Sequence, residues 1–565
     1  MQSTANQGFG GATVGSSEFQ FQREDNRLIQ AHIGFSYLNL LLGALAGVLQ
    51  TLQRTGVIHL PSALGYYQLL TLHGVSLALV FTTFFIIGFL FSGVAKTTGG
   101  ELGKAERAWG WIGFWLMLVG TVLAVIAIGT NNASVLYTFY APLKASPWFY
   151  IGLAGLVVGS WCSAIAIFIA FARWRRAHRG ESSPLFAYMA VATMILWVIC
   201  TLGVAIEVVA LLIPWSMGLV QRVDVSLSRT LFWYFGHALV YFWLLPAYIY
   251  WYINIPRLVK GRIFSDSLPR LTFILFILYS IPVGLHHQFN EPGIDSFWKF
   301  VQTVLTFFVV IPSFMTAFSL LATFELAGRS QGAKGLFGWI AKLPYKDVRF
   351  LAPFLGMLLF VPAGIGGIIN ASYQLNQVVH NTLWITGHFH LTLASTVVLT
   401  FFGISYMLIP VLTGRKLSRF VNNLGILQAF VWVIGMSFMS GAMHAVGLLG
   451  EPRRISFTTY GDAPITQAWI PYRTAMAIGG SFLFAGIVLF LIIALYLWFF
   501  AHKSDMPNEY PIGEVEPDQP KPPYFLERWS IWIGVAFVLI LIAYTMPFVQ
   551  MFVHPAPGAL PMRTW

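Results

Sequence analysis

The sequence has 565 residues, of which 57% are hydrophobic and only 10% are charged, and its mean hydropathy is +0.71. Soluble domains carry about 25% charged residues, so this chain has too little polar surface for a soluble globule and is predicted to cross a membrane many times. Its formal net charge of +12 raises the question of an anionic partner. Its only cysteines, Cys162 and Cys200, lie in apolar runs, which excludes both a disulfide framework and a cysteine-rich metal site.

The chain begins with a polar, Gly- and Ser-rich stretch, residues 1–26, which lacks the apolar core of a signal peptide and is predicted to be a flexible cytoplasmic tail. Residues 27–556 are predicted to form one transmembrane domain, in which an acidic, Pro-rich cytoplasmic loop occupies residues 504–524; residues 557–565 form an outer tail. Crossing a bilayer takes about 20 apolar residues in a helix. Thirteen runs meet that requirement: 29–53, 66–95, 108–130, 147–172, 185–214, 229–256, 271–287, 298–327, 350–372, 380–413, 420–449, 474–501 and 530–553.

The loop charges predict the orientation of these spans. With the N-terminus inside, 24 of the 33 Lys and Arg residues fall in inside segments, as the positive-inside rule requires. The basic excess is therefore mostly topological, and a nucleic-acid partner is excluded. The predicted fold is an all-α bundle of about 13 transmembrane helices with the N-terminus inside and the C-terminus outside.

Six histidines from four predicted spans fall at one depth of the membrane, roughly 10–15 Å below the outer surface at 1.5 Å per residue. A single intramembrane histidine often caps a polar network or faces a cavity. Six at a similar depth favour metal binding instead, because neutral imidazole is a common ligand for Cu, Fe and Zn. The six are His73 (span 66–95), His237 (229–256), His286 and His287 (271–287), and His388 and His390 (380–413).

The spacing of the histidines indicates how the metals are shared. Residues i and i+2 of a regular helix point about 200° apart, so His388 and His390 are expected to contact two different cofactors. His286 and His287 stand where their helix is ending, which lets both rings converge on one ion. Tyr241 is four residues after His237 and shares its helix face; a lone tyrosine there is ordinary packing, but beside a metal its phenol is a source of a proton and an electron.

Three segments carry a specific resemblance: 236-GHALVYFWLLPAY-248, 286-HHQF-289 and 380-HNTLWITGHFH-390. They resemble the signature segments of subunit I of the haem–copper oxygen reductases, the terminal respiratory oxidases. The resemblance covers about residues 25–555 and is closest to the B-type branch of cytochrome c oxidases, whose subunit I has thirteen helices. The glutamate that the more common branch carries just after the histidine of the sixth span is missing from 237-HALVY-241, which favours the B type.

The resemblance implies three metals. His73 and His390 correspond to the axial ligands of a low-spin haem, expected to be of the b type, and His388 to the single ligand of a high-spin haem. His237, His286 and His287 correspond to the ligands of one copper ion, CuB, and Tyr241 to the tyrosine joined covalently to the copper-ligand histidine. The type of the high-spin haem, a, b or o, is not readable from a histidine ligand.

Proton delivery is expected along the span 229–256. Tyr241, Tyr248 and Tyr252 fall within about 20° of one helix face and step inward over about 16 Å. The resemblance implies that they line the single proton-input path of the B-type enzymes with three hydroxyls of the span 298–327, Ser313, Thr316 and Ser319. A packing interface that happens to bear hydroxyl groups is the alternative explanation of this spacing.

On the outer side, Arg453 and Arg454 resemble the pair that binds haem propionates, and His380 and Asn381 resemble residues beside the propionates of the high-spin haem. Two positions depart from the pattern: Ala238 replaces the usual proline, and Asn376 replaces an aspartate thought to load pumped protons, which puts the exit route in doubt. Glu207 is a buried carboxylate without an assigned role.

The resemblance further implies O2 as the substrate, proton pumping, and a prokaryotic-type plasma membrane as the location. The expected partners are a subunit II with a dinuclear copper site, cytochrome c as the electron donor with quinol as the alternative, and a small single-helix subunit. Two other functions remain open. A nitric oxide reductase would carry non-haem iron instead of copper and lacks the tyrosine, and a non-enzymatic transporter predicts broken helices and paired half-repeats.

Overall fold

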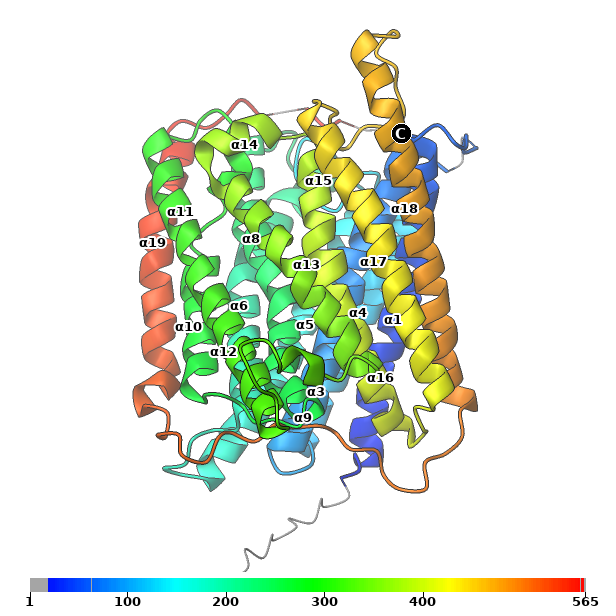
Figure 1. Ribbon diagram of the computed structural model, residues 1–565. Coiled ribbons are helices and arrows are strands. Elements are labelled where there is room, and N and C mark those ends of the chain that lie inside the picture. The colour runs from blue at the N-terminus through cyan, green and yellow to red at the C-terminus, as the bar shows by residue number, and fades with distance from the viewer. Residues whose placement is uncertain (1–18, 62–63, 559, 563–565) are drawn as a thin grey trace, which may run out of the picture.

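The computed structural model describes residues 19–61, 64–558 and 560–562. In this part of the chain thirteen helical segments are long and apolar enough to span a membrane, as predicted, and no strand is formed. The predicted N-terminal tail lies outside the described residues up to residue 18, and residues 559 and 563–565 of the C-terminal tail do so too. The start of α1 and the end of α19 lie at opposite ends of the bundle (Figure 1).

The first seven spans contain four of the six predicted histidine ligands. In chain order they are α1 (Arg23–Arg54); α2 (Tyr66–Gly74), η1 (Val75–Phe81) and α3 (Thr82–Thr97); α4 (Lys104–Gly129); α5 (Pro147–Ala177); α6 (Leu185–Ile206), η2 (Glu207–Leu212) and α7 (Ile213–Ser216); α8 (Val225–Ile249), η3 (Tyr250–Asn254) and α9 (Ile255–Leu258); and α10 (Ser267–Ser280) with η4 (Leu285–Gln288).

The other six spans complete the bundle. They are α11 (Ser296–Phe308) with α12 (Val310–Ser330); α13 (Val348–Ala371); α15 (Leu383–Phe389), η6 (His390–Val397) and α16 (Val398–Thr413); α17 (Arg419–Leu448); α18 (Pro464–Leu495) with η7 (Tyr496–Phe500); and α19 (Trp529–Val553). Three short helices, η5 (Ile340–Lys342), α14 (Tyr373–Val379) and η8 (Tyr524–Glu527), lie between spans.

Side-chain caps set where several helices begin. The Asp224 carboxylate accepts from the Leu227 N–H at 2.9 Å before α8, and the Thr382 hydroxyl accepts from the Trp384 N–H at 3.2 Å before α15. These bonds satisfy amide groups that a helix cannot pair internally. The two helices that carry His237 and His388 therefore start at defined residues.

Burial separates central from peripheral spans. The spans that carry His73, His237 and the His388–His390 pair are 89%, 94% and 89% buried over their most apolar windows, whereas that of α19 is only 22% buried. The apolar side chains on the outside of the bundle suit contact with lipid. The predicted histidine-bearing helices thus form the centre of the molecule.

Two helices differ locally from the prediction. The predicted helix 271–287 is interrupted: α10 ends at Ser280, and His286 and His287 lie on the separate 3-10 helix η4. Beyond His388 the chain changes to π-helix at His390, where the i→i+5 pattern alters the angular spacing of side chains. Interruptions of an α-helix by π-helical geometry occur often at functional sites.

Candidate metal centre

One cavity of about 660 Å³ joins the predicted metal ligands. All six histidines and Tyr241 line it, although they come from α2, α8, η4, α15 and η6. Arg453 and Arg454 also line this cavity. Most of the other lining residues are apolar, so the cavity is suited to a large, flat, mostly hydrophobic group with acidic substituents.

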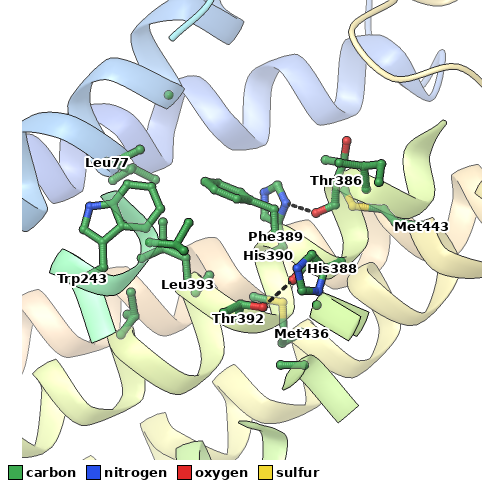
Figure 2. Close-up of a pocket in the computed structure, with 18 of the residues that line it drawn as sticks. Leu77, Trp243, Thr386, His388, Phe389, His390, Thr392, Leu393, Met436 and Met443 are labelled. Atoms are coloured by element: carbon green, nitrogen blue, oxygen red, sulfur yellow. Dashed lines mark hydrogen bonds between the residues drawn. The ribbon is translucent and has the colours of Figure 1, made fainter. Parts of the chain in front are cut away.

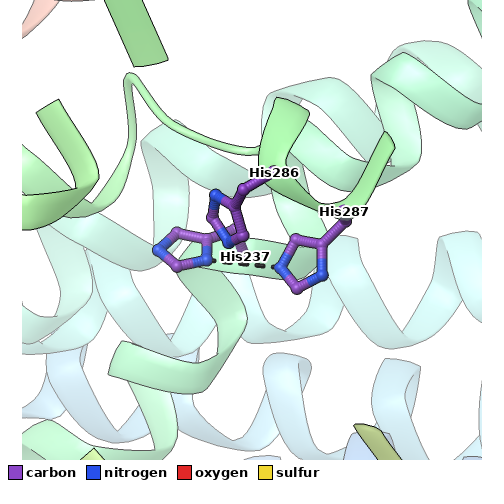
Figure 3. Close-up of side chains that lie close together, drawn as sticks. All are labelled: His237, His286 and His287. Atoms are coloured by element: carbon purple, nitrogen blue, oxygen red, sulfur yellow. Dashed lines mark hydrogen bonds between the residues drawn. The ribbon is translucent and has the colours of Figure 1, made fainter. Parts of the chain in front are cut away.

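His237, His286 and His287 converge into one cluster (Figure 3). One ring nitrogen from each lies within 4.8 Å of those of the other two, and Nδ1 of His237 is 3.4 Å from Nε2 of His287. Around a tetrahedral metal with bonds of about 2.0 Å, ligand atoms lie about 3.3 Å apart. The cluster therefore has the dimensions of a three-histidine metal site with an open position.

The turn that carries His286 and His287 is held by its neighbours. The Gln302 Oε1 on α11 accepts hydrogen bonds from the Gly284 and Leu285 N–H groups, both at 2.9 Å. A Cβ at Gly284 would lie 2.6 Å from the Trp233 carbonyl oxygen, so only glycine allows this approach to α8. The Trp233 ring in turn stacks on His287 with centroids 4.1 Å apart.

His73 and His390 face each other across the cavity. Their rings are nearly parallel, at 11°, with centroids 6.1 Å apart. The Nδ1 atom of His73 bonds the Gly43 carbonyl at 2.9 Å, and that of His390 bonds the Thr386 carbonyl at 2.8 Å. A ring whose Nδ1–H is bonded to a carbonyl presents its Nε2 lone pair to a metal, so the pair fits two axial ligands of one iron.

His388 is directed to a different place from His390, although only Phe389 separates them (Figure 2). Its ring packs beside Trp384 with centroids 5.9 Å apart, and it lies against α13, where a Cβ at Gly366 would come within 2.6 Å of its Nδ1. His390 instead faces His73, whose Nδ1 would lie 2.5 Å from a Cβ at Gly47, on α1. The i/i+2 expectation of two different partners agrees with this geometry.

Tyr241 and the predicted hydroxyl path follow His237 along α8 and η3, with three hydroxyls contributed by α12. The Tyr241 ring is 5.1 Å from that of His237, measured between centroids. Farther along the helix the Tyr252 hydroxyl donates to Thr316 Oγ1 at 3.0 Å, and Ser313 faces Tyr248. Ser319 is buried and its Oγ has no hydrogen-bond partner among the described residues, which suits an internal water.

Arg453 and Arg454 form a positive region in the lining of the cavity. Neither makes an ion pair with a carboxylate in the described ranges, and the buried Nε of Arg453 has no partner there. Burial and the adjacent Arg454 lower the pKa of Arg453 to about 10. Burial raises the pKa of Tyr140, but Arg454, Arg229 and Arg453 together outweigh it and lower that pKa to about 8.

These groups fit the propionates of a haem, since buried guanidinium groups without a carboxylate favour anionic ligands. Asn381 is bonded to this region: its Oδ1 accepts from Nη2 of Arg453 at 2.9 Å. Burial and, to a smaller extent, the positive charge of Arg453 lower the pKa of His380 to about 4. The Asn376 Oδ1 lies 2.9 Å from Nδ1 of His380, and its Nδ2 donates to the Asn370 carbonyl at 2.6 Å.

Several residues at the site were missed from the sequence. Gln302 and Trp233 support the histidine turn, and the Tyr140 hydroxyl accepts from Nη1 of Arg454 at 2.9 Å. Glu207, for which the sequence suggested no role, accepts a bond from the Ser228 hydroxyl at 2.7 Å and does not line the cavity. Gln302, a glutamine in an apolar helix, was the one signal available in the sequence. Trp233 and Tyr140 do not stand out, because the chain contains many aromatic residues.

Comparisons with known proteins decide the family. The sequence pattern described as "Cytochrome C and Quinol oxidase polypeptide I" matches residues 27–482. The chain belongs to this family. It is 41% identical over 543 residues to cytochrome c oxidase subunit 1 of Thermus thermophilus, covering 94% of this chain and 95% of that protein.

More distant oxidases show the same relationship. Quinol oxidase subunit 1 of Bacillus subtilis is 23% identical over 478 residues, covering 79% of this chain and 68% of that protein. A solved structure, the cryo-EM structure of a haem–copper terminal oxidase dimer, is 35% identical with a TM-score of 0.90 and covers 96% of both chains.

Membership of this family establishes the coarse function. The chain is a polytopic membrane protein and an oxidoreductase, the catalytic subunit of a terminal oxidase, related to bacterial plasma-membrane oxidases. The family implies haems and CuB as cofactors and association with a subunit II. The prediction of an oxidase is thus supported over a nitric oxide reductase or a transporter.

Proposed function

We propose that this chain is subunit I of a B-type oxygen reductase that reduces O2 to water, with four electrons and four protons consumed per O2. The observation that carries the proposal is the single cavity lined by all six histidines and Tyr241. The absence of a glutamate from 237-HALVY-241 and the thirteen spans support the B type.

His73 and His390 would hold a low-spin haem, expected to be haem b, and His388 a high-spin haem. His237, His286 and His287 would hold CuB. Bound there, the two haems and the copper would supply the electron-transfer and O2-binding chemistry, which the cofactors and not the side chains possess. Arg453 and Arg454, with His380 and Asn381 beside them, would bind the propionates.

The chain's own residues would deliver protons. Tyr241 is buried and its ring adjoins His237, so its hydroxyl can give a proton at the copper side of the cavity. Tyr248, Tyr252, Ser313, Thr316 and Ser319 would return that proton from the cytoplasm. The Tyr252–Thr316 bond and the unpartnered Ser319 hydroxyl support this path, because a chain of hydroxyls and internal waters conducts protons only where groups lie within hydrogen-bond reach.

Uptake from the cytoplasm and release on the other side would store about 2.3 kcal/mol per charge at 100 mV. Proton uptake from the cytoplasm requires the N-terminal tail, residues 1–26, and the loop 504–524 between the last two spans to lie inside. The C-terminal tail, residues 557–565, would then lie outside. Asn376 cannot titrate. We therefore place no proton-loading group at that position.

Electrons would arrive from partner proteins, because the two cysteines of this chain do not form a dinuclear copper site. A subunit II with a dinuclear copper site, cytochrome c as its donor, and a small single-helix subunit complete the proposed assembly. The name of the Bacillus relative keeps quinol as the alternative donor.

The decisive experiment is metal and haem analysis of the purified complex with a reduced spectrum before and after CO. We expect two haems and one copper in this subunit, with CO shifting one haem only. Two haems with a non-haem iron and no copper would identify a nitric oxide reductase instead, and the role of Tyr241 would be packing.

A further inference from the structure

A buried ion cluster joins three segments that are far apart in the sequence. Oε1 of Glu451 accepts from Nη2 of Arg54, at the end of α1, at 3.0 Å and from Nε of Arg473, on α18, at 3.1 Å. The side chains of Arg54, Glu451 and Arg473 are 7%, 0% and 5% exposed. The cluster therefore buries two cations and one anion, a net charge of one.

Additional hydrogen bonds hold the chain around this cluster. Arg54 donates to the carbonyls of Pro452 and Ile455, both at 2.7 Å. The Arg473 guanidinium donates to the Thr458 carbonyl at 3.3 Å and lies 5.3 Å from the Phe457 ring. Buried charges persist only with such partners, and the partners here all belong to one segment, 451–458.

That segment contains the proposed propionate ligands and also contacts the histidine helix. The Glu451 carbonyl accepts from the N–H of Leu383, the first residue of α15, at 2.9 Å. The Arg453 N–H donates to the Asn381 carbonyl at 2.9 Å. Displacing Glu451 would therefore move Arg453 relative to α15, which begins five residues before His388 and seven before His390.

Arg54 also reaches the cavity itself. It lines the cavity, and it lies seven residues after Gly47, the residue against which the His73 ring packs. Seven residues correspond to about 10 Å along α1. The surplus positive charge of the cluster thus lies toward the propionate end of the proposed low-spin haem site.

We propose that Glu451 is a positioning residue: it holds Arg54 and Arg473 together, fixes the segment that binds the propionates, and sets the charge that this cluster presents to the low-spin haem. A nearby positive charge favours the reduced haem and so raises its reduction potential. The inference rests on the proposed function for the assignment of His73 and His390 to a low-spin haem and of Arg453 and Arg454 to haem propionates.

The test uses the intact complex and charge-matched variants. Glu451→Gln changes the cluster from one net positive charge to two, Arg473→Gln changes it to zero, and the double variant restores one. We expect the low-spin haem potential, measured by spectroelectrochemical titration, to rise in Glu451→Gln, fall in Arg473→Gln and return near wild type in the double variant. Low-spin haem should dissociate about tenfold faster from Glu451→Gln, as for other supports of a metal site.

Asp462→Asn is the control, since it removes the same charge from an exposed residue of the same loop. The inference fails if Glu451→Gln matches this control in haem retention and potential. Potentials that do not follow the order of charge also overturn it, even where haem is lost, because a merely structural brace would not track charge. A wild-type complex without a low-spin haem would refute the proposed function instead.

Discussion

At the scale of single residues, the proposed metal binding depends on how each imidazole ring is held: one ring nitrogen is hydrogen-bonded, which leaves the other free for a metal. The carbonyls of Gly43 and Thr386 accept hydrogen bonds from His73 and His390 and so orient both rings. Such bonds determine which nitrogen is free for a metal. The glycines that meet His73 and His388 matter for the same reason, because a methyl group at either would displace a ring.

The two histidines of α15 and η6 should be separable by mutation. We expect His390→Ala to lose the low-spin haem and keep the CO-binding haem, and His388→Ala to do the reverse, because each ring faces a different partner. Haem content and CO difference spectra of both variants would measure this. Each variant is the control of the other, and loss of both haems from both would contradict separate sites.

Tyr241→Phe should keep both haems and copper but reduce O2 at least ~100-fold more slowly, the contribution typical of a positioned proton donor. Steady-state O2 consumption and metal content would be measured together. Tyr250→Phe serves as the control: that tyrosine is buried nearby, but its hydroxyl donates to the Arg349 carbonyl and it does not line the cavity. Equal activity in the two variants would exclude a role for the Tyr241 hydroxyl.

At the scale of helices, breaks in regular structure place the functional groups. The interruption after Ser280 turns His286 and His287 toward His237, and this turn depends on Gln302 of the neighbouring α11. Gln302 further donates to the Ala543 carbonyl of α19 at 3.1 Å. One buried amide therefore couples the copper-type cluster to two peripheral helices.

Gln302→Leu should lower the copper affinity by about 10- to 100-fold, the effect expected when a support of metal ligands is removed. It leaves two buried N–H groups without an acceptor, at about 1–3 kcal/mol each. Copper content after dialysis against a chelator would show the loss, with both haem spectra retained. Thr303→Val, which removes a hydroxyl bonded only within its own helix, should keep its copper; copper loss from both variants would indicate general damage to α11.

Proton supply is likewise a property of two helices acting together. Tyr252→Phe removes the donor to Thr316 and should slow proton uptake at least ~10-fold while haem reduction by the donor stays normal. Uptake would be followed with a pH indicator during a single turnover. Thr121→Val on α4 is a suitable control because its hydroxyl bonds the Met117 carbonyl of its own helix. Unchanged uptake in Tyr252→Phe would leave these hydroxyls as a packing interface.

At the scale of the whole molecule, an odd number of spans would put the two termini of the chain on different sides of the membrane. Residues 504–528 cross the lower end in Figure 1, whereas the 451–463 loop lies at the upper end with the histidine-bearing half. The proposed orientation makes the lower end cytoplasmic, so that protons and electrons reach the cavity from opposite sides.

Cysteine labelling should verify this orientation. Asp518→Cys is expected to react with an impermeant thiol reagent only from the cytoplasmic side, and Asp462→Cys only from the outside, since both residues are exposed. Native Cys162 and Cys200 are buried and should not react. Labelling of the wild-type chain under the same conditions is the control for this. Labelling of both positions from the same side would contradict the crossing of the membrane by the one span between them, Pro464–Phe500.

The sequence by itself determined the class of fold and predicted the metal ligands. Both follow from local properties: apolar length decides whether a helix spans a membrane, and a histidine in an apolar run is costly unless it has a function. The i/i+2 spacing was sufficient to separate His388 from His390. The predicted span 271–287 is present, but its α-helix ends at Ser280, because the turn that follows depends on contacts of Gly284 with Gln302 of α11 and Trp233 of α8.

Only the tertiary structure decided which distant residues support the site. Arg54 and Glu451 are 397 residues apart, and nothing in either local sequence indicates that they share a buried ion pair. Periodicity and composition report on a residue's own helix, whereas a bond between helices depends on how thirteen spans pack. The structure thus added the contacts that orient the ligands, the single cavity that joins them, and the charge cluster beside it.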